Sequence, residues 1–213
     1  MKILIAIPCM QTVLVDFVES LMVMDKPEQT DIHFWQGSLV HDARNMLTIK
    51  AVTDGYDYVM WMDSDMVFPT NTLTRLLQVA QENNVGMVSG LYVKRTFPTL
   101  PVIYDKLAPP TVDDNGKPVK NIHEYVDYPV NSVFPIAGCG FGCVLTSVSL
   151  LKKVWEHNNI PAFTPLPWAG EDIAFCIRTN ETGERILCDS SVSCGHLGTF
   201  CYNEKMLKRG DVN

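Results

Sequence analysis

Short apolar runs and amphipathic stretches alternate along the first 95 residues of the chain. The runs are rich in branched apolar residues and have the length of buried strands. They cover residues 2–8, 31–37, 58–65 and 85–93. The stretches between them repeat apolar side chains every three or four residues, which predicts helices over about 12–24 and 40–53. A third helix is expected after Pro69, with Thr70 as its cap.

This alternation, with short connections, predicts βαβ units and an α/β fold, a three-layer α/β/α sandwich around a mainly parallel central sheet. The pattern changes after residue 95. Residues 96–135 are rich in Pro, Asp and Asn, and we expect antiparallel strands there with a hairpin turn at 113–116. A Gly-rich stretch at 137–142 then leads to a helix beginning near Ser147, a second short helix and a last strand. We therefore expect one domain over 1–213 with a smaller antiparallel C-terminal portion.

The composition narrows the possible functions only moderately. The chain has 213 residues, of which 46% are hydrophobic and 19% charged, as in a globular domain with a real core. Its 17 basic and 24 acidic side chains give a net charge of -7, and without a long basic run no broad nucleic-acid surface is expected. An acidic protein can still bind phosphate when a divalent cation mediates the contact.

The seven cysteines are scattered and include no C-x-x-C pair, which argues against a structural zinc site. We interpret them as reduced thiols of a cytoplasmic protein. The N-terminal run "MKILIAIPC" reads as a strand and not as a secretion signal. No apolar stretch approaches the ~20 residues that a membrane span requires, so no built-in membrane anchor is expected.

The run 58–65 ends in two acids, Asp63 and Asp65. Residues two apart in a strand share a face, and open α/β sheets bind ligands at the carboxyl ends of their strands. Two carboxylates in that place suit a hard divalent cation, which can in turn carry phosphate oxygens. The alternative is a solvated acidic loop, because D-x-D is short enough to occur by chance.

Four segments together carry a family resemblance: "HDARNMLTIKAVTDGYDYVMWMDSDMVFP", "GCGFGCVLTSVSLLKKV", "GEDIAFCIR" and "VSCGHLG". In order and spacing they resemble nucleotide-sugar glycosyltransferases of the GT-A fold, especially the family 2 type. The resemblance spans nearly the whole chain apart from 96–135. It implies a nucleotide-binding half over 1–95 and an acceptor-binding and catalytic half over 96–213.

The resemblance implies a metal site for Mn²⁺ or Mg²⁺ with three ligands. Asp65 would ligate the metal directly, and Asp63 would contact the metal or the donor ribose, with Ser64 between them at the donor. His196 looks like the third ligand, and a neutral imidazole suits Mn²⁺ beside carboxylates. The alternative for His196 is a loop histidine without a ligand.

Glu171 and Asp172 look like the acid pair of the family at the start of a helix. In inverting members one such acid takes the proton of the acceptor hydroxyl, and Asp172 is the favoured base. The alternative is purely structural, since acids at a helix N-terminus are stabilised by the helix dipole.

Several other residues are candidate contacts to the donor. Pro8 and Cys9 end the first strand, where the family binds its nucleotide. The remaining candidates are Arg44, Asn45, Lys94 with Arg95, and Gly138 with its neighbouring glycines. Arg44 and Asn45 can equally be a surface charge and an amide, and the glycines can serve a tight turn. The second strand ends without the acid that the family often has there, which leaves the nucleotide open.

The leading hypothesis is a metal-dependent, hexosyltransferase-like enzyme that moves a sugar from a nucleoside diphosphate sugar, expected to be UDP-linked, to a hydroxyl. Its acceptor can be a glycan, a lipid carrier, a protein or a modified DNA base of a phage, and retention or inversion stays open. Two other classes remain. A sugar nucleotidyltransferase is disfavoured because "IPCMQTVLV" lacks a Gly-rich phosphate loop. A non-catalytic donor-binding module is disfavoured because the catalytic set is complete.

Overall fold

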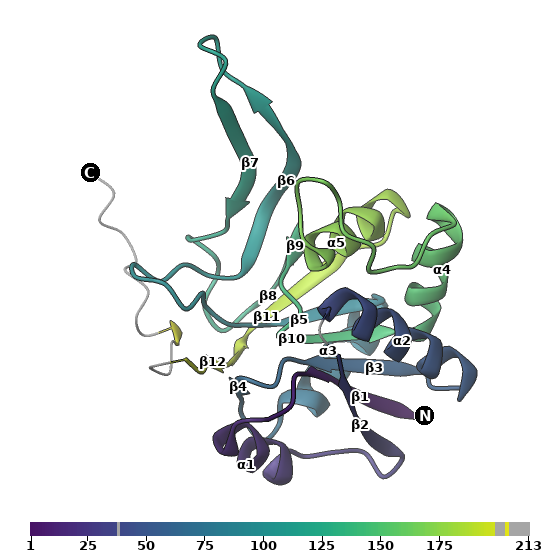
Figure 1. Cartoon of the computed structure of the whole chain (residues 1–213). Helices are drawn as coiled ribbons and strands as arrows, with labels where there is room; N and C mark the ends of the chain where they lie inside the picture. The colour runs from purple at the N-terminus through teal and green to yellow at the C-terminus, as the bar shows by residue number, and fades with distance from the viewer. Residues whose placement is uncertain (38, 199–202, 205–213) are drawn as a thin grey trace.

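A seven-stranded sheet forms the centre of the computed structural model, which describes residues 1–37, 39–198 and 203–204 (Figure 1). Its strand order is β2-β1-β3-β10-β5-β11-β8. The strands are β1 (Ile3–Cys9), β2 (Thr30–Gln36), β3 (Tyr58–Met62), β5 (Met87–Leu91), β8 (Val133–Ile136), β10 (Cys143–Ser147) and β11 (Ile186–Ser193). Only β10 and β8 run against the direction of the others. The predicted mainly parallel sheet is confirmed.

Helices cover both faces of this sheet, which confirms the three-layer sandwich. They are α1 (Val15–Val23), α2 (Val40–Thr53), α3 (Thr72–Asn83), α4 (Val148–Asn158) and α5 (Glu171–Glu181). In β1, Ile3, Ile5 and Ile7 pack with α1 and α3, whereas Leu4 and Ala6 pack with α2 and α4. Because successive side chains of a strand point to opposite faces, an uninterrupted apolar run is what a strand buried on both sides requires.

Two small sheets flank the central one. β4 (Met66–Val67) pairs with β12 (Gly195–His196), and β6 (Ile103–Val112) pairs with both β7 (Pro118–Glu124) and β9 (Gly138–Cys139). The hairpin of β6 and β7 projects from the body as an arm (Figure 1). Its turn lies at the predicted position, where Gly116 has φ +76° and the Asp113 side chain accepts two backbone N–H groups.

Two local predictions were wrong, and one strand was missed. β3 ends at Met62 and not at 65, because the chain turns at Asp63, whose carbonyl accepts the N–H of Met66 at 3.3 Å. One strand was not predicted: β10 follows the Gly-rich stretch and inserts between β3 and β5. Thr70 does not cap α3: the capping position is Asn71, without a side-chain hydrogen bond.

The helix expected near Ser147 does begin there, and the Ser147 hydroxyl accepts the N–H of Leu150 at 3.1 Å. Among the helices formed by the described residues, none has the length and apolar character needed to cross a membrane.

Candidate functional site

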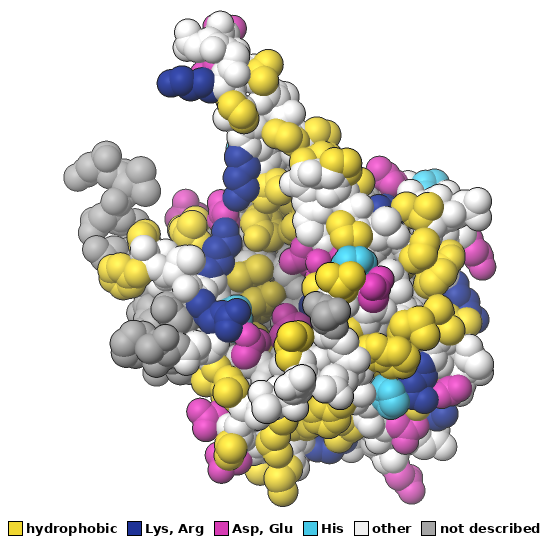
Figure 2. All heavy atoms as spheres, viewed as in Figure 1, with side chains coloured by type: hydrophobic (Ala, Val, Ile, Leu, Met, Phe, Trp, Pro, Cys, Tyr) yellow, Lys and Arg dark blue, Asp and Glu magenta, His cyan; other side chains and the backbone are white. Residues whose placement is uncertain are grey.

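A cleft of about 300 Å³ lies at the carboxyl ends of β1 and β3, where an open α/β sheet binds its ligands. It is lined by Pro8, Cys9, Met10, Gly37, Val40, Ala43, Asp63, Ser64, Asp65, Arg95 and His196. Figure 2 shows acidic and basic side chains gathered around a hollow at the foot of the β6–β7 arm. The cleft therefore brings His196 together with five other predicted site residues, which come from two distant parts of the sequence, 8–9 and 63–65.

Arg44 connects the two acidic motifs. From α2, its Nη2 lies 2.8 Å from Oδ1 of Asp63, and its Nη1 pairs with Oε1 of Glu171 at the start of α5. The Arg44 side chain is only 3% exposed, and its guanidinium lies over the Phe141 ring, 5.3 Å from the ring centroid. Arg44 is thus a buried ion-pair partner, a role that neither the phosphate-contact nor the surface-charge reading anticipated.

The charged groups of this cluster shift one another's pKa values. Burial raises the pKa of Asp63, Arg44 offsets part of that rise, and the nearby Asp65 adds to it. Burial would lower the pKa of Arg44, but the carboxylates of Asp63, Glu171 and Asp172 outweigh burial and raise it. Arg44 therefore stays charged, and it is the buried cation that allows these acids to lie close together.

Asp65 has different partners from Asp63. Its Oδ2 lies 2.7 Å from Nη1 of Arg95 and 3.5 Å from Nε2 of His196. Burial would raise the pKa of Asp65, but its contact with His196 and the charge of Arg95 lower it overall. The expected shared face of the two acids is therefore not observed, because the turn at residue 63 sends one carboxylate toward α2 and the other toward β12.

The backbone fixes the ring of His196. β12 pairs antiparallel with β4, so that His196 lies opposite Met66, and Leu197 N donates to Asp65 O at 2.7 Å. Nδ1 of His196 lies 2.9 Å from the carbonyl oxygen of Val93. Because a carbonyl only accepts, Nδ1 carries the proton, and in the neutral ring Nε2 presents its lone pair to Asp65. This is the arrangement by which proteins orient metal-binding histidines.

These residues fit a divalent cation that is shared with a substrate. Within 1–37, 39–198 and 203–204, no three His, Cys, Asp or Glu side chains form a ready metal site, and the Asp63 carboxylate is turned to Arg44. Asp65 and His196 remain as a pair. Two ligands at right angles, each about 2.1 Å from one cation, lie about 3 Å apart, so their 3.5 Å separation needs little change. Mg²⁺ and similar ions commonly take one or two protein ligands and complete their shell with phosphates and water.

The acid pair at the start of α5 divides into two environments. Glu171 is held by Arg44, whereas Oδ1 of Asp172 accepts the N–H of Ile173 at 2.7 Å. Burial raises the pKa of Asp172, Glu171 raises it further, and Arg44 offsets part of the rise. The pKa of Asp172 is therefore raised, the direction that makes a carboxylate a better proton acceptor.

Other predicted contacts lie outside the cleft lining. Oδ1 of Asn45 accepts the backbone N–H of Phe163 at 3.0 Å, and Lys94 pairs with Glu124 at 2.5 Å. Gly138 is buried, and a Cβ there would lie 2.7 Å from Cδ1 of Leu107. Packing within the protein thus accounts for this glycine.

One residue that the sequence did not single out is Tyr92. It is buried, its ring stands edge-on to His196 with centroids 5.5 Å apart, and its hydroxyl accepts the N–H of Gly142 at 3.1 Å. In the sequence Tyr92 is simply an apolar residue near the end of a strand, and only its place two residues before Lys94 gave a signal.

Comparison with known proteins agrees with this geometry. The structure is similar to the crystal structure of A197 from STIV, with a TM-score of 0.70 and 19% identity over 100% of this chain and 97% of that one. It is also similar to the crystal structure of GalNAc-T7 with UDP, GalNAc and Mn2+, with a TM-score of 0.61 and 11% identity over 97% of this chain and 45% of that one. At such identities the likeness shows the fold alone, which is the GT-A fold.

No curated protein matches the sequence. The model of the family described as Glycosyl transferase family 2 matches residues 15–155, well over half of the chain. The matched range includes α2, β10 and the two acids that follow β3. With the GT-A architecture and this match, the chain belongs to glycosyl transferase family 2.

Proposed function

We propose that this member of the family is a metal-dependent glycosyltransferase that moves a sugar from a UDP-sugar to a hydroxyl acceptor. The observation that carries the proposal is the meeting of Asp65 and His196 in the cleft while Arg44 joins Asp63 to Glu171. These contacts support a single site that contains both the metal pair and the acid pair. The presence of UDP and Mn2+ in the GalNAc-T7 crystal structure supports this choice of donor and metal.

Six residues of the cleft have a part in donor binding in this proposal. Asp65 and Nε2 of His196 hold the cation, and Pro8, Cys9 and Ser64 line the space for the nucleotide. Arg95 is 47% exposed beside Asp65, where it can turn to the diphosphate. When bound, Mn²⁺ or Mg²⁺ supplies positive charge that stabilises the leaving diphosphate.

Asp172 is the base of this proposal. In an inverting transfer the acceptor oxygen forms a bond to the anomeric carbon while the bond from that carbon to the diphosphate breaks, and the electron pair leaves with the diphosphate. The proton of the acceptor hydroxyl goes to Asp172. Its raised pKa favours proton uptake, whereas Glu171 is committed to Arg44.

The acceptor belongs to the half formed by residues 96–213, which includes the β6–β7 arm and α5. Candidate acceptors are a glycan, a lipid carrier, a protein and a hydroxymethylated DNA base. Each offers a hydroxyl group, so the chemistry at Asp172 is the same in all of them. The donor can be tested before the acceptor is known, because donor binding can be measured without an acceptor.

The decisive experiment is a panel of nucleotide sugars with Mn²⁺, in which binding is measured by calorimetry and nucleotide release by chromatography. We expect one UDP-sugar to bind only with metal, and Asp65→Ala to abolish that binding. Asp54→Ala is the matched control, since Asp54 follows α2 at the opposite end of β3 and its carboxylate pairs with Lys50. If no donor binds or is hydrolysed, the proposal fails.

A further inference from the structure

β11 departs from regular pairing just before the segment that carries His196. Asp189 pairs with Gly90 of β5, but the next paired residue of β11 is Ser193, opposite Leu91. Residues 190–192 have no partner on β5, because β5 advances by one residue while β11 advances by four. A bulge of this kind bends a strand and redirects the chain that follows.

The bulge lies where the chain leaves the central sheet. Beyond it, Cys194 N donates to Leu91 O at 2.8 Å, and the next two residues form β12, which pairs with β4. His196 then lies opposite Met66, the residue after Asp65. The position of the His196 ring beside Asp65 therefore depends on the direction in which the chain leaves the bulge.

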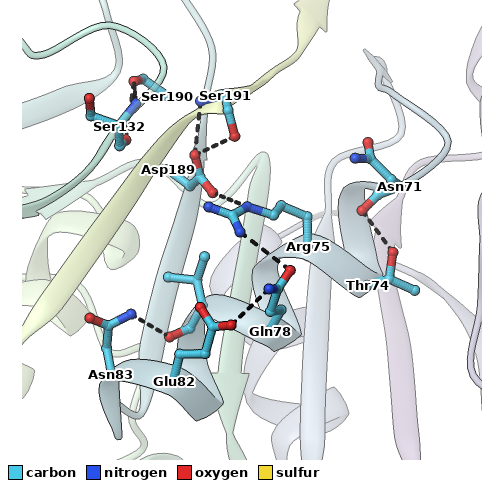
Figure 3. Close-up of polar contacts among 11 residues, drawn as sticks. Asn71, Thr74, Arg75, Gln78, Glu82, Asn83, Ser132, Asp189, Ser190 and Ser191 are labelled. Atoms are coloured by element: carbon cyan, nitrogen blue, oxygen red, sulfur yellow. Dashed lines mark hydrogen bonds and ion pairs between the residues drawn. The ribbon is translucent and has the colours of Figure 1, made fainter.

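Asp189 closes the bulge from the inside. Its side chain is 1% exposed, and its Oδ1 accepts both the N–H of Ser191 at 2.9 Å and the hydroxyl of Ser191 at 2.6 Å. Figure 3 shows the Asp189 carboxylate between Ser191 on one side and Arg75 on the other. One carboxylate oxygen thus holds the unpaired segment in a fixed loop.

Arg75 of α3 supplies the charge that this buried carboxylate needs. Its Nε donates to Oδ2 of Asp189 at 2.6 Å, and its Nη1 donates to Gln78 on the same helix at 3.3 Å (Figure 3). A buried carboxylate that loses its cation is strongly disfavoured in that position. The ion pair therefore anchors the bulge to α3, an element that contributes no side chain to the cleft lining.

The side of the bulge toward β8 is fixed as well. Ser190 N donates to Ser132 O at 3.0 Å, and the Ser190 hydroxyl donates to Pro129 O at 2.7 Å. Backbone partners thus hold one flank of the bulge, and Arg75 holds the other through Asp189. Loss of Arg75 would release only the flank that leads on to β12.

From these contacts we infer that Arg75 and Asp189 are positioning residues for the metal site: they fix the β11 bulge and so place His196 Nε2 opposite Asp65. The inference rests on the proposed function insofar as His196 is a metal ligand. Neither residue touches metal or substrate. Changes to groups that orient metal-binding histidines cost about 10–100-fold in metal affinity, and we expect a loss of about tenfold here because the effect passes through the chain.

The test compares Arg75→Met with wild type in two measurements. The first is the affinity for Mn²⁺ alone by calorimetry, where we expect a loss of about tenfold. The second is the long-range ¹H–¹⁵N imidazole spectrum of the metal-free protein, where the His196 resonance of the Nδ1–H form should shift or broaden. Arg75→Lys keeps a charged donor for Asp189 and should retain more affinity than Arg75→Met.

Lys153→Met is the control. It removes another ion pair of 2.6 Å, with Glu184, at a site remote from the cleft lining, and should leave both measurements unchanged. Ser191→Ala removes one hydrogen bond at an exposed position and provides a milder variant if Arg75→Met does not fold. It should shift the His196 resonance in the same direction.

Two results separate this inference from the proposed function. If the Arg75→Met protein folds and its His196 resonance is unchanged, the inference is overturned. If Arg75→Met does not fold, an unchanged resonance in Ser191→Ala overturns it instead. If His196→Ala binds Mn²⁺ as tightly as wild type, the metal assignment in the proposed function fails instead. The imidazole spectrum of the metal-free variant still decides whether Arg75 and Asp189 position the ring.

Discussion

Replacing Arg44 by methionine tests whether one buried cation holds the two acidic motifs together. Methionine keeps much of the length and the apolar contacts of the arginine side chain but removes the guanidinium. Arg44 is 3% exposed and pairs with Asp63 and with Glu171. The variant therefore leaves both carboxylates without their shared partner.

The expected loss of stability depends on how far Arg44, Asp63 and Glu171 are buried. Removing one partner of a buried ion pair costs about 3–5 kcal/mol. The Asp63 side chain is 34% exposed, and water will compensate part of its loss, so we expect the lower end, about 3 kcal/mol. For a domain of about 200 residues, 1 kcal/mol corresponds to about 2–4 °C in Tm, which gives a decrease of about 6–12 °C.

Thermal unfolding followed by circular dichroism, together with urea titration, measures this decrease. Adding Glu171→Gln to Arg44→Met should restore part of it, because one of the two unpaired charges is then absent; a coupling energy of about 1 kcal/mol or more is expected. Lys153→Met, which breaks a half-exposed pair, should cost below about 1 kcal/mol. If Arg44→Met lowers Tm no more than Lys153→Met does, the reasoning is refuted.

Four further results are expected. Asp65→Ala should weaken Mn²⁺-dependent donor binding by about 100-fold or more, measured by calorimetry, with an unchanged circular dichroism spectrum. Asp172→Asn should lower kcat by about 10²–10⁴-fold at an unchanged donor KM. In wild type, the acid limb of the pH–rate profile should lie above pH 3.8, the ordinary carboxyl pKa, because burial raises the pKa of Asp172. Burial would raise the pKa of Glu124, but the lysine partners of Glu124 lower it from 4.5 to about 2. The contribution of Glu124 to stability is therefore complete above pH 4.5 and is lost as the pH falls toward 2. Glu124→Gln should abolish this part of the pH dependence of Tm. Arg95→Met should increase the affinity for Mn²⁺ alone, because it frees Asp65, and decrease the affinity for the UDP-sugar; equal changes in both would contradict this role.

The fold was predictable where its signal is local. The periodicity of α2 predicted the bounds that the structure has, Val40–Thr53, because its apolar stripe lies against one face of the sheet. β10 was missed because its position is decided by pairing with β3 and β5, which are far away in the sequence. Five residues between a Gly-rich stretch and a helix carry little evidence of such partners.

The sequence predicted which residues line the cleft but not which contacts they make with one another. Asp63, Asp65 and His196 do line one cleft, as the family resemblance implied. The alternation argument for the two acids was wrong because Asp63 N donates to Gly142 O as the strand ends and the chain turns. Arg44 on the buried side of α2 was the available signal, since an arginine among apolar helix positions needs buried acids as partners.

The two acids that follow β3 should therefore respond differently to a cation. Asp63 is held by Arg44, which is buried and cannot turn to water, so its partner is permanent. Asp65 is held by Arg95, which is 47% exposed, and ion pairs of that kind contribute little and exchange readily. In the proposed function, a divalent cation would displace Arg95 from Asp65 without disturbing Arg44. The same displacement would release an arginine beside the cleft as the diphosphate arrives with the metal, and one exposed ion pair would link metal binding to donor binding.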